Sequence, residues 1–204
     1  MGIVVNDSQN LFMLQTRSNS YAFGIDNQGL VRHLYWGSRI NAMEDFEMPE
    51  LAEVSTNDPV YEITKEEFPV YGGLRYKEHC LKVTFADGTR DVAYEYVNYE
   101  IQKNEQCEEL VIILKDKHYA LVMELHYKIY EAYDLMERFV VLKNESTEVM
   151  QIEKLHSGQF HVPYEGLNFR NVHGHWGAEQ QKFVQKVDYG KIIFENRRGI
   201  SSHN

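Results

Sequence analysis

Hydrophobic and polar residues alternate with a period of two along several stretches of the chain. From residue 121 to residue 129 every second position is Leu, Met, Leu, Tyr or Ile, while Glu124, His126 and Lys128 lie between them. Residues 21–25 repeat this alternation with Tyr, Phe and Ile. A period of two is typical of a strand with one face against a core and the other in water. We therefore predict strands at both places.

Turn residues separate the predicted strands. The sequence Asp26-Asn27-Gln28-Gly29 follows one strand, and Asp87-Gly88 lies between two apolar stretches at residues 82–85 and 91–96. Asp-Gly favours the positive φ angle of a tight hairpin, so we expect these two stretches to pair with each other. The aromatic and β-branched residues of 92–101 fit a pleated sheet. A further strand is expected at residues 191–194.

The whole pattern predicts an all-β fold. No segment has a sustained apolar period of 3.6, and many short strands with polar turns indicate two packed antiparallel sheets. No stretch has the composition of a linker, so we expect one domain over residues 1–204. The acidic residues 41–67, which include Pro49 and Pro59, have little pattern and predict a long excursion with one short helix. Loops of that length are often functional.

The charge and the cysteine content limit the classes of partner and the cellular compartment that we expect. The 204 residues include 31 acidic and 21 basic side chains, for a net charge of −10, which argues against nucleic acid and anionic membranes as main partners. No apolar run reaches the roughly 18–20 residues of a membrane helix. The N-terminus lacks the pattern of an export signal. Cys80 and Cys107 are therefore expected to be free thiols in a reducing cytoplasm.

The sequence has no phosphate-binding, dinucleotide-binding or nucleophilic-serine motif, and we expect no cofactor. His173 and His175 are spaced as metal ligands on a strand could be, but a zinc site needs three or four ligands, so we predict no metal. Hydrogen bonding within a loop is the alternative role for these two residues. His156 and His161 are suited either to proton transfer or to structural hydrogen bonds.

Each of the two tryptophans is followed by glycine, as Trp36-Gly37 and Trp176-Gly177. An indole face can stack on the CH groups of a sugar ring, or it can fill a core or an interdomain seam. The polar C-terminal residues 197–204 suit either a frayed tail or an interface loop. Both alternatives stay open from composition alone.

Two segments near the C-terminus resemble the end of the N-terminal domain of glycoside hydrolase family 36 α-galactosidases. That family has a Gly-x-Trp-Gly-x-Glu segment, then a strand, then Ser-Arg-Arg-Gly-x-Ser-Ser-His. Asn196 replaces the serine before the double arginine here. The segments at residues 68–72 and 127–131 support the resemblance. The matching positions are Gly174, Trp176, Gly177 and Glu179, then Arg197, Arg198, Gly199, Ser201, Ser202 and His203.

One motif departs from the family pattern. Where the family has Asp, then Phe or Tyr, then Arg, this chain has Arg75-Tyr76-Lys77. The acidic residue is lost and the basic residue is conservatively changed. A divergent substrate preference is one expected consequence.

The resemblance implies a large two-sheet antiparallel β-supersandwich related to galactose mutarotase. Family enzymes hydrolyse terminal α-galactosides such as melibiose and raffinose with retention, using two aspartates on a (β/α)8 barrel that follows this domain. We therefore assign no catalytic residue to this chain and expect the barrel downstream. The fragment alone is expected to be inactive, and the parent protein to be a cytoplasmic enzyme without cofactors.

The resemblance also suggests site residues and partners. The expected partners are the protein's own catalytic barrel, the α-galactoside substrate of the complete protein, and further copies of the chain, since many family members are tetramers. The excursion at 41–67 is the candidate for the contact between subunits. The substrate-rim candidates are Trp36, Arg75 and Lys77, and the interdomain-seam candidates are Trp176, Glu179, Arg197, Arg198 and His203.

Two other functions fit an isolated β-sandwich. A stand-alone mutarotase-like epimerase needs a histidine and a carboxylate, for which His156 or His173 with Glu179 are available. The chain is short for such an enzyme. A non-catalytic carbohydrate-binding module is the third hypothesis, but the seam motif would then have no partner to meet.

Overall fold

The computed structural model describes residues 2–44, 46, 48, 65–72, 78–162, 166–188 and 190–194. These residues form two compact units, Met1–His161 and Val162–Asn204, each of which we describe by itself. The single domain expected over residues 1–204 therefore stays a prediction. In the part of the chain that the structure describes, no helix has the length and apolar character needed to cross a membrane.

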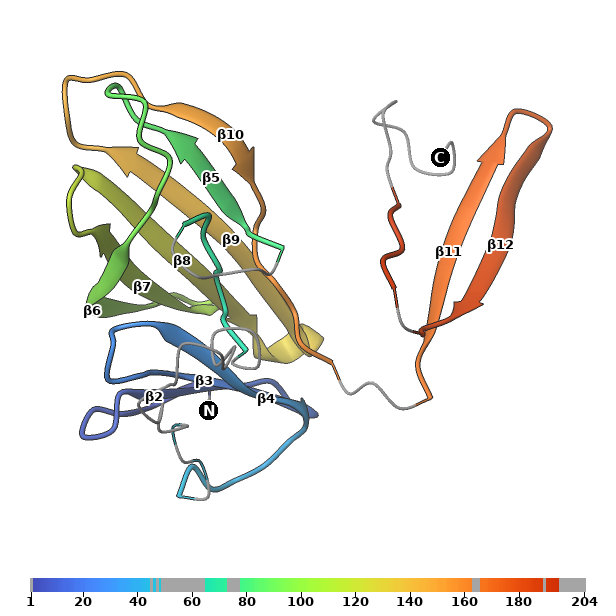
Figure 1. The fold of residues 1–204 in the computed structure, drawn as a ribbon. Coiled ribbons are helices and arrows are strands. Elements are labelled where there is room, and N and C mark those ends of the chain that lie inside the picture. Colours follow the sequence, from blue (N-terminus) through green and yellow to red (C-terminus); the bar gives the residue numbers. More distant parts are fainter. Residues whose placement is uncertain are drawn as a thin grey trace. The chain divides into compact units, whose positions relative to one another are not determined.

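The first unit is built from three antiparallel sheets (Figure 1). One four-stranded sheet has the order β1-β2-β3-β4 and the other has the order β6-β7-β8-β9, while β5 pairs with β10. Their bounds are β1 Ile3–Asn6, β2 Leu11–Gln15, β3 Asn19–Ile25, β4 Val31–Ser38, β5 Leu81–Thr84, β6 Tyr94–Lys103, β7 Glu108–Asp116, β8 Leu121–Tyr130, β9 Leu135–Asn144 and β10 Gln151–Leu155. A single 3-10 turn, Glu131–Tyr133, connects β8 to β9. The predicted all-β antiparallel fold is confirmed.

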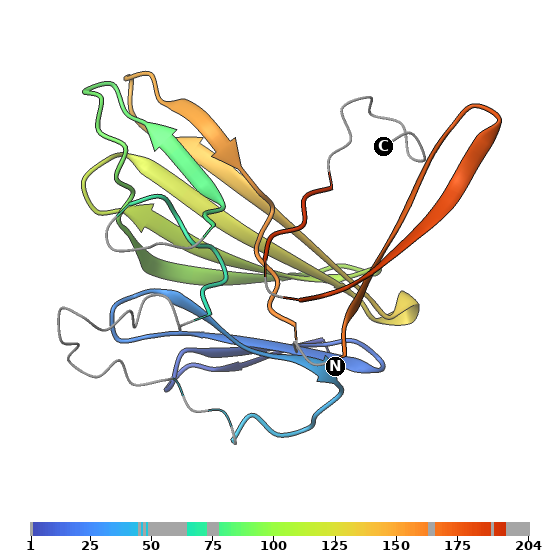
Figure 2. The ribbon, with the colours of Figure 1, turned by 45° about the vertical axis from the view of Figure 1, so that its right-hand side comes forward.

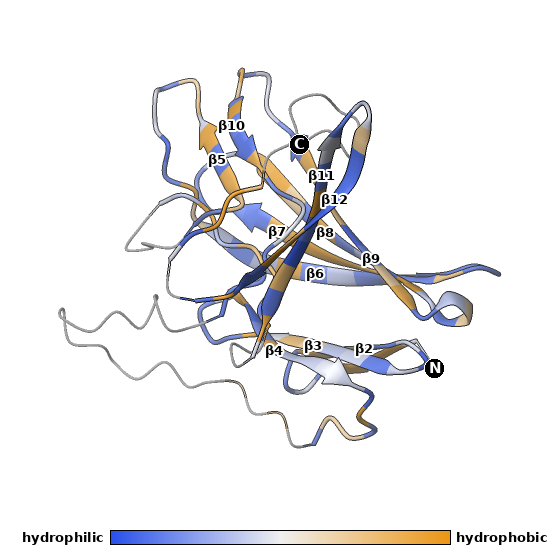
Figure 3. Cartoon of the chain, turned by 90° about the vertical axis from the view of Figure 1, so that its right-hand side faces the viewer, coloured by the Kyte–Doolittle hydropathy of each residue, from blue (hydrophilic) through white to orange (hydrophobic). Residues whose placement is uncertain are grey.

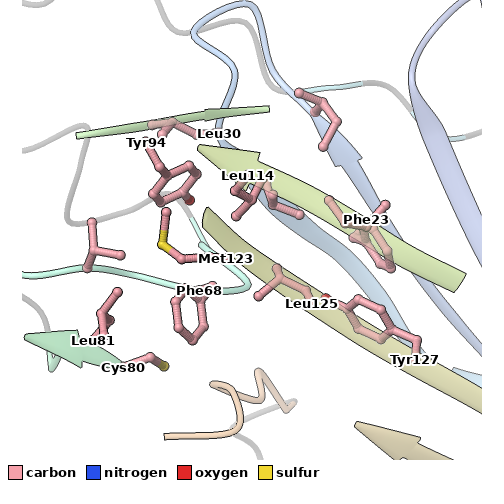
Figure 4. Packing of buried hydrophobic residues seen from close by; sticks show 14 of the residues in the cluster. Phe23, Leu30, Phe68, Cys80, Leu81, Tyr94, Leu114, Met123, Leu125 and Tyr127 are labelled. Atoms are coloured by element: carbon pink, nitrogen blue, oxygen red, sulfur yellow. The ribbon is translucent and has the colours of Figure 1, made fainter. Parts of the chain in front are cut away.

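The two four-stranded sheets lie one above the other and share a core (Figure 2). Phe23 on β3 stacks on Tyr127 of β8, with ring centroids 4.8 Å apart. Figure 4 shows Phe68 and Leu81 beside Met123, so β5 and the chain before it close the same core. On β8 the alternation is as predicted, because the odd-numbered residues are buried and the charged ones face away. Burial of these apolar faces supplies the main driving force for the fold.

The β1–β4 sheet is covered on both faces. Its second face packs Leu11 and Met13 against the chain that follows β4, including Met43 and Met48. A Cβ atom at Gly24 would lie 2.4 Å from the sulfur of Met48, so the absence of a side chain at Gly24 gives the methionine room to pack here. Burial on both faces explains why the sequence of β2, Leu-Phe-Met-Leu, is apolar without interruption.

The prediction that the stretches on either side of Asp87-Gly88 pair with each other is wrong. Gly88 does adopt a positive φ of 87°, and the Phe85 amide donates to the carbonyl of Thr89 at 2.8 Å. However, β5 pairs with β10, and the chain after the turn becomes β6 of a different sheet. After the turn, the Arg90 guanidinium binds Glu153 on β10 at 2.6 Å.

The expected excursion at 41–67 lies largely outside the described residues, as does any short helix within it. Its described end is an extended segment, residues 65–72, that joins two sheets. The Glu67 amide donates to the Val31 carbonyl of β4 at 3.0 Å, and the Tyr71 amide donates to the Leu81 carbonyl of β5 at 2.8 Å. This segment therefore crosses from one sheet to the next through the core.

The second unit is a hairpin of β11, Asn168–His175, and β12, Ala178–Lys186. Figure 3 shows β12 as mostly hydrophilic, with hydrophobic positions at intervals. Residues 191–194 form no strand, so that prediction is wrong. Instead Phe194 stacks on Phe169 of β11, with ring centroids 4.2 Å apart.

Core burial yields a direct test. Replacing Leu125, which is 0% exposed, by Ala should lower the free energy of unfolding by about 2–5 kcal/mol, because a cavity remains between the sheets. The matched control is Leu135→Ala on β9, where the side chain is 53% exposed. Urea unfolding followed by circular dichroism measures both. Equal losses in the two variants would contradict the assigned core.

Candidate functional site

The side chain of Glu67 is buried in the first unit, with 0% exposure. It accepts hydrogen bonds from the Tyr21 hydroxyl at 2.6 Å and from the Tyr127 hydroxyl at 3.1 Å. His33 Nδ1 lies 2.9 Å from the same carboxylate and donates to it. We call these residues, together with Arg138, the Glu67 cluster. It joins β3 and β4 of one sheet to β8 and β9 of the other.

Arg138 supplies the countercharge. Its Nη1 lies 2.8 Å from Glu67 Oε2, and its Nη2 donates to the Glu67 carbonyl at 2.6 Å. The guanidinium also lies over the Tyr127 ring and the Phe160 ring, 5.1 and 5.4 Å from their centroids. Gly158 leaves room for it, since a Cβ there would lie 2.5 Å from Arg138 Cζ. Arginine suits this place because its fork binds two acceptors at once.

The cluster has defined protonation states. Burial alone would raise the pKa of Glu67, but the charge of Arg138 and the hydrogen bond from His33 hold that pKa below its ordinary value of 4.5. Burial, followed by the Glu67 charge, raises the pKa of Tyr21. At neutral pH the carboxylate is therefore ionised and the hydroxyls stay protonated as donors. A carboxylate so enclosed and so fully hydrogen-bonded positions its neighbours and has no access to a substrate.

A second buried ionic group lies beside the first. Arg32 Nε donates to Asp26 Oδ2 at 2.7 Å, and its Nη1 lies 3.4 Å from Glu66 Oε1. His161 Nε2 lies 3.0 Å from the Glu66 carbonyl. Two adjacent residues of the 65–72 segment thus bind different arginines: Glu66 pairs with Arg32 and Glu67 with Arg138. This arrangement fixes the segment between the sheets.

A cavity of about 340 Å³ opens next to the Glu67 cluster, and we call it the aromatic hollow. Trp36 of β4 is 39% exposed and Phe160 is 48% exposed, with ring centroids 5.7 Å apart. Tyr21 borders both the cluster and the hollow, since its ring meets Trp36 edge-on at 6.2 Å. The remaining lining residues are Leu14, Thr16, Asn19, Ser20, Ile129, Asp134, Leu135 and Met136.

The rim of the hollow is held by a contact between two turns. Asp134 has a left-handed backbone, with φ of 55°, after the 3-10 turn. Its Oδ1 accepts from the Ser18 amide at 2.9 Å, and its Oδ2 accepts from the Ser18 hydroxyl. Hydrogen bonds, first that from the Ser18 side chain, lower the pKa of Asp134 to about 2. The rim therefore carries a fixed negative charge at neutral pH.

The structure places only some of the predicted site residues. Trp36 lies in the aromatic hollow of the first unit. Trp176 is 87% exposed at the tip of the β11–β12 hairpin, where Glu179 Oε1 accepts from the Gly177 amide at 2.9 Å. The other predicted residues lie outside the described residues: Arg75 and Lys77 of the rim, and Arg197, Arg198 and His203 of the seam.

The thiols and histidines have clear environments. Cys80 and Cys107 are both free, as expected. Burial raises the pKa of the Cys80 thiol to about 11, which makes it a poor nucleophile. His161 has the structural role described above, while His156 is exposed. Among the described residues, no three His, Cys, Asp or Glu side chains are grouped to hold a metal ion.

Sequence reasoning did not identify Glu67, Arg138, His33 or Phe160 as members of one site. An acidic residue followed by the apolar run Phe68-Pro69-Val70 was the available signal, since a carboxylate beside a buried segment needs a partner. The identity of that partner depends on which strands meet, which periodicity does not reveal.

Comparison with known proteins assigns the chain to a family. The family model for the glycosyl hydrolase family 36 N-terminal domain matches residues 29–204. This chain belongs to that family. The resemblance found in the sequence is thereby confirmed.

Two relatives named as α-galactosidases are similar to this chain over part of their own length. It is 26% identical over 207 residues to a probable α-galactosidase G of Aspergillus terreus, covering 94% of this chain and 28% of the relative. It is 23% identical over 226 residues to the bifunctional α-galactosidase/sucrose kinase AgaSK of Mediterraneibacter gnavus, covering 100% of this chain and 24% of the relative. The chain thus spans about a quarter of each relative's length.

The fold agrees with a solved family 36 structure. The crystal structure of the α-galactosidase AgaB from Geobacillus stearothermophilus matches with a TM-score of 0.84 and 23% identity. The match covers 100% of this chain and 31% of that one. At this identity the likeness concerns the fold, and the predicted N-terminal sandwich is confirmed.

The Glu67 cluster predicts a large loss of stability in the variant Glu67→Gln. The amide keeps the shape but leaves the Arg138 charge buried without its counterion, so the free energy of unfolding should fall by about 3–5 kcal/mol. The control Glu95→Gln removes an exposed carboxylate of β6 and should change it by less than about 0.5 kcal/mol. Urea unfolding at neutral pH measures both variants.

The parent chain and Glu67→Gln should also differ in how their stability depends on pH. The pKa of Glu67 is lower in the folded state than its ordinary value of 4.5. Its contribution to the free energy of unfolding is therefore fully present above that pH and is lost as the pH falls below it. The stability of the parent chain should therefore decline more steeply on acidification than that of Glu67→Gln. Parallel pH curves for the two proteins would show that folding does not lower the pKa of Glu67.

Proposed function

We propose that this chain is the non-catalytic N-terminal domain of an α-galactosidase that hydrolyses terminal α-galactosides of the melibiose and raffinose type with retention. The observation that carries the proposal is the family 36 match over residues 29–204, together with relatives named as α-galactosidases. About a quarter of each relative is matched, so their other regions have no counterpart in these 204 residues.

The described residues favour a supporting role over catalysis. A retaining glycosidase needs two accessible carboxyl groups about 5–5.5 Å apart on either side of the bond that is cleaved. Glu66 and Glu67 are adjacent, but both are buried and bound to arginines. We therefore propose that the catalytic carboxylates lie on a barrel outside these residues, with Trp36, Arg75 and Lys77 at its substrate rim.

The second unit is the proposed seam with the barrel. Trp176, Val184 and Ile193 are exposed on this small hairpin unit, and apolar side chains so placed are typical of a surface that another domain covers. Glu179, Arg197, Arg198 and His203 complete the proposed seam. We further propose that the protein is cytoplasmic, works without a cofactor and forms a homo-oligomer in which the excursion at 41–67 contacts another subunit.

The activity is tested with the complete protein that contains this chain. It should release nitrophenol from p-nitrophenyl α-galactopyranoside, while the 204-residue chain alone should not. The rate of hydrolysis should be the same with and without an added metal ion or cofactor. Hydrolysis of an α-glucoside in place of the α-galactoside, or hydrolysis by the 204-residue chain itself, would refute the proposal.

Anchoring by the hairpin is tested by Trp176→Ala in the complete protein. Removal of this side chain should weaken the seam between the second unit and the proposed barrel. The chain that connects this domain to the barrel should then become more sensitive to trypsin, and thermal unfolding should separate into two transitions. Tyr133→Ala, which removes a comparably exposed aromatic residue of the first unit, is the control. If both variants behave like the parent protein, Trp176 has no anchoring role.

A further inference from the structure

The aromatic hollow has the chemistry of a small-ligand site. Its floor is apolar, formed by the buried side chains of Leu14 and Ile129. Two partly exposed rings, Trp36 and Phe160, form its wall at 47° to each other. Its volume of about 340 Å³ is at the lower end of the range for small-molecule sites. A compact ligand with an apolar face and several hydroxyl groups matches these features.

The rim offers polar partners to such hydroxyls. Asp134 is ionised. Each of its oxygens accepts one hydrogen bond from Ser18, and the Thr16 side chain donates another, so a carboxylate with about four acceptor positions still has room for a ligand hydroxyl. Asn19 also lines the hollow and presents an amide at the exposed edge. A carboxylate and an amide at the rim, together with two aromatic rings in the wall, suit a ring that has polar edges and an apolar face.

The site is held in shape before any ligand arrives. The Tyr21 ring supports Trp36 edge-on, and its hydroxyl is fixed by Glu67. Phe160 lies under the Arg138 guanidinium. The Ser18–Asp134 contact ties two turns that are 116 positions apart. A preformed site loses less conformational entropy on binding, which favours even a small ligand.

We propose that the aromatic hollow binds a single galactopyranose ring, stacked by its apolar face on Trp36 and Phe160 with its hydroxyls toward Asn19 and Asp134. The axial O4 hydroxyl of galactose lies on one face of the ring, so the C3, C4 and C5 hydrogens form an apolar patch on the opposite face. The hollow binds the sugar without the catalytic part. The inference rests on the proposed function for the identity of the sugar, and it shares Trp36 with the proposed substrate rim.

The experiment uses the 204-residue chain with Trp176→Phe, so that Trp36 is its only tryptophan. Methyl α-D-galactopyranoside is added while the indole N–H signal of Trp36 is followed by ¹H–¹⁵N NMR. A saturable shift is expected, with a dissociation constant on the order of 1–10 mM. Methyl α-D-glucopyranoside should bind at least several-fold more weakly.

Two further variants locate the site. In the same background, Phe160→Ala should weaken binding of the galactoside about tenfold or more, since one aromatic wall is lost. Phe183→Ala, which removes a partly exposed phenylalanine of the second unit, should leave the dissociation constant unchanged. Circular dichroism confirms that each variant is folded, and any variant that is not is replaced by the milder Phe160→Leu.

Several results would overturn the proposal. One is the absence of a saturable Trp36 shift up to about 100 mM galactoside. Another is an equal affinity after Phe160→Ala, or an affinity for the glucoside that matches that for the galactoside. A Trp36 signal that changes with protein concentration alone would show that a second copy of the chain occupies the hollow. Each result is independent of the hydrolysis assay, so it leaves the proposed activity untouched and bears only on the proposed role of Trp36.

Discussion

The ion pair between Glu67 and Arg138 sets how the two four-stranded sheets of the first unit meet. Glu67 lies on the segment that crosses the core, and Arg138 lies on β9. Two tyrosines and a histidine complete the hydrogen bonds of the carboxylate, so the charge of Glu67 is compensated within the core. A buried pair of this kind adds little net stability compared with apolar packing. Its contribution is to penalise any other alignment of the sheets, since another register would leave a charge buried without its partner.

The Glu67 cluster and the aromatic hollow share side chains, and this connects stability to function. Tyr21 donates to Glu67 and supports Trp36, while Phe160 lies between the guanidinium of Arg138 and the hollow. The aromatic wall is therefore only as rigid as the ionic cluster behind it. A change in the charge of the core would alter the wall without touching any lining residue. Rigid support from a second layer of side chains is what a weak, shallow site requires.

The sequence allowed the strands to be predicted better than their partners. The alternation at residues 121–129 identified the inward face of β8 correctly, because burial on one face of a sheet imposes a period of two. The same reasoning failed at Asp87-Gly88, where the turn is present but the strands beyond it belong to different sheets. A local turn signal fixes the direction of the chain over four residues, whereas the partner of β5 is far away in the sequence, as in the pairing of Leu81 with Leu155. The Glu67 cluster was out of reach for the same reason, since its members come from four strands and a connecting segment.

The members of the Glu67 cluster are widely separated along the chain. Tyr21 lies 46 positions before Glu67, Tyr127 lies 60 positions after it, and Arg138 lies 117 positions after Tyr21. During synthesis the first sheet is therefore available long before the strands that must cover it. Until β9 leaves the ribosome, Glu67 has no countercharge and remains better solvated in water than in a core. Contacts of such long range make folding slow. The carboxylate thus delays closure of the sandwich until the last strand that it needs has been made.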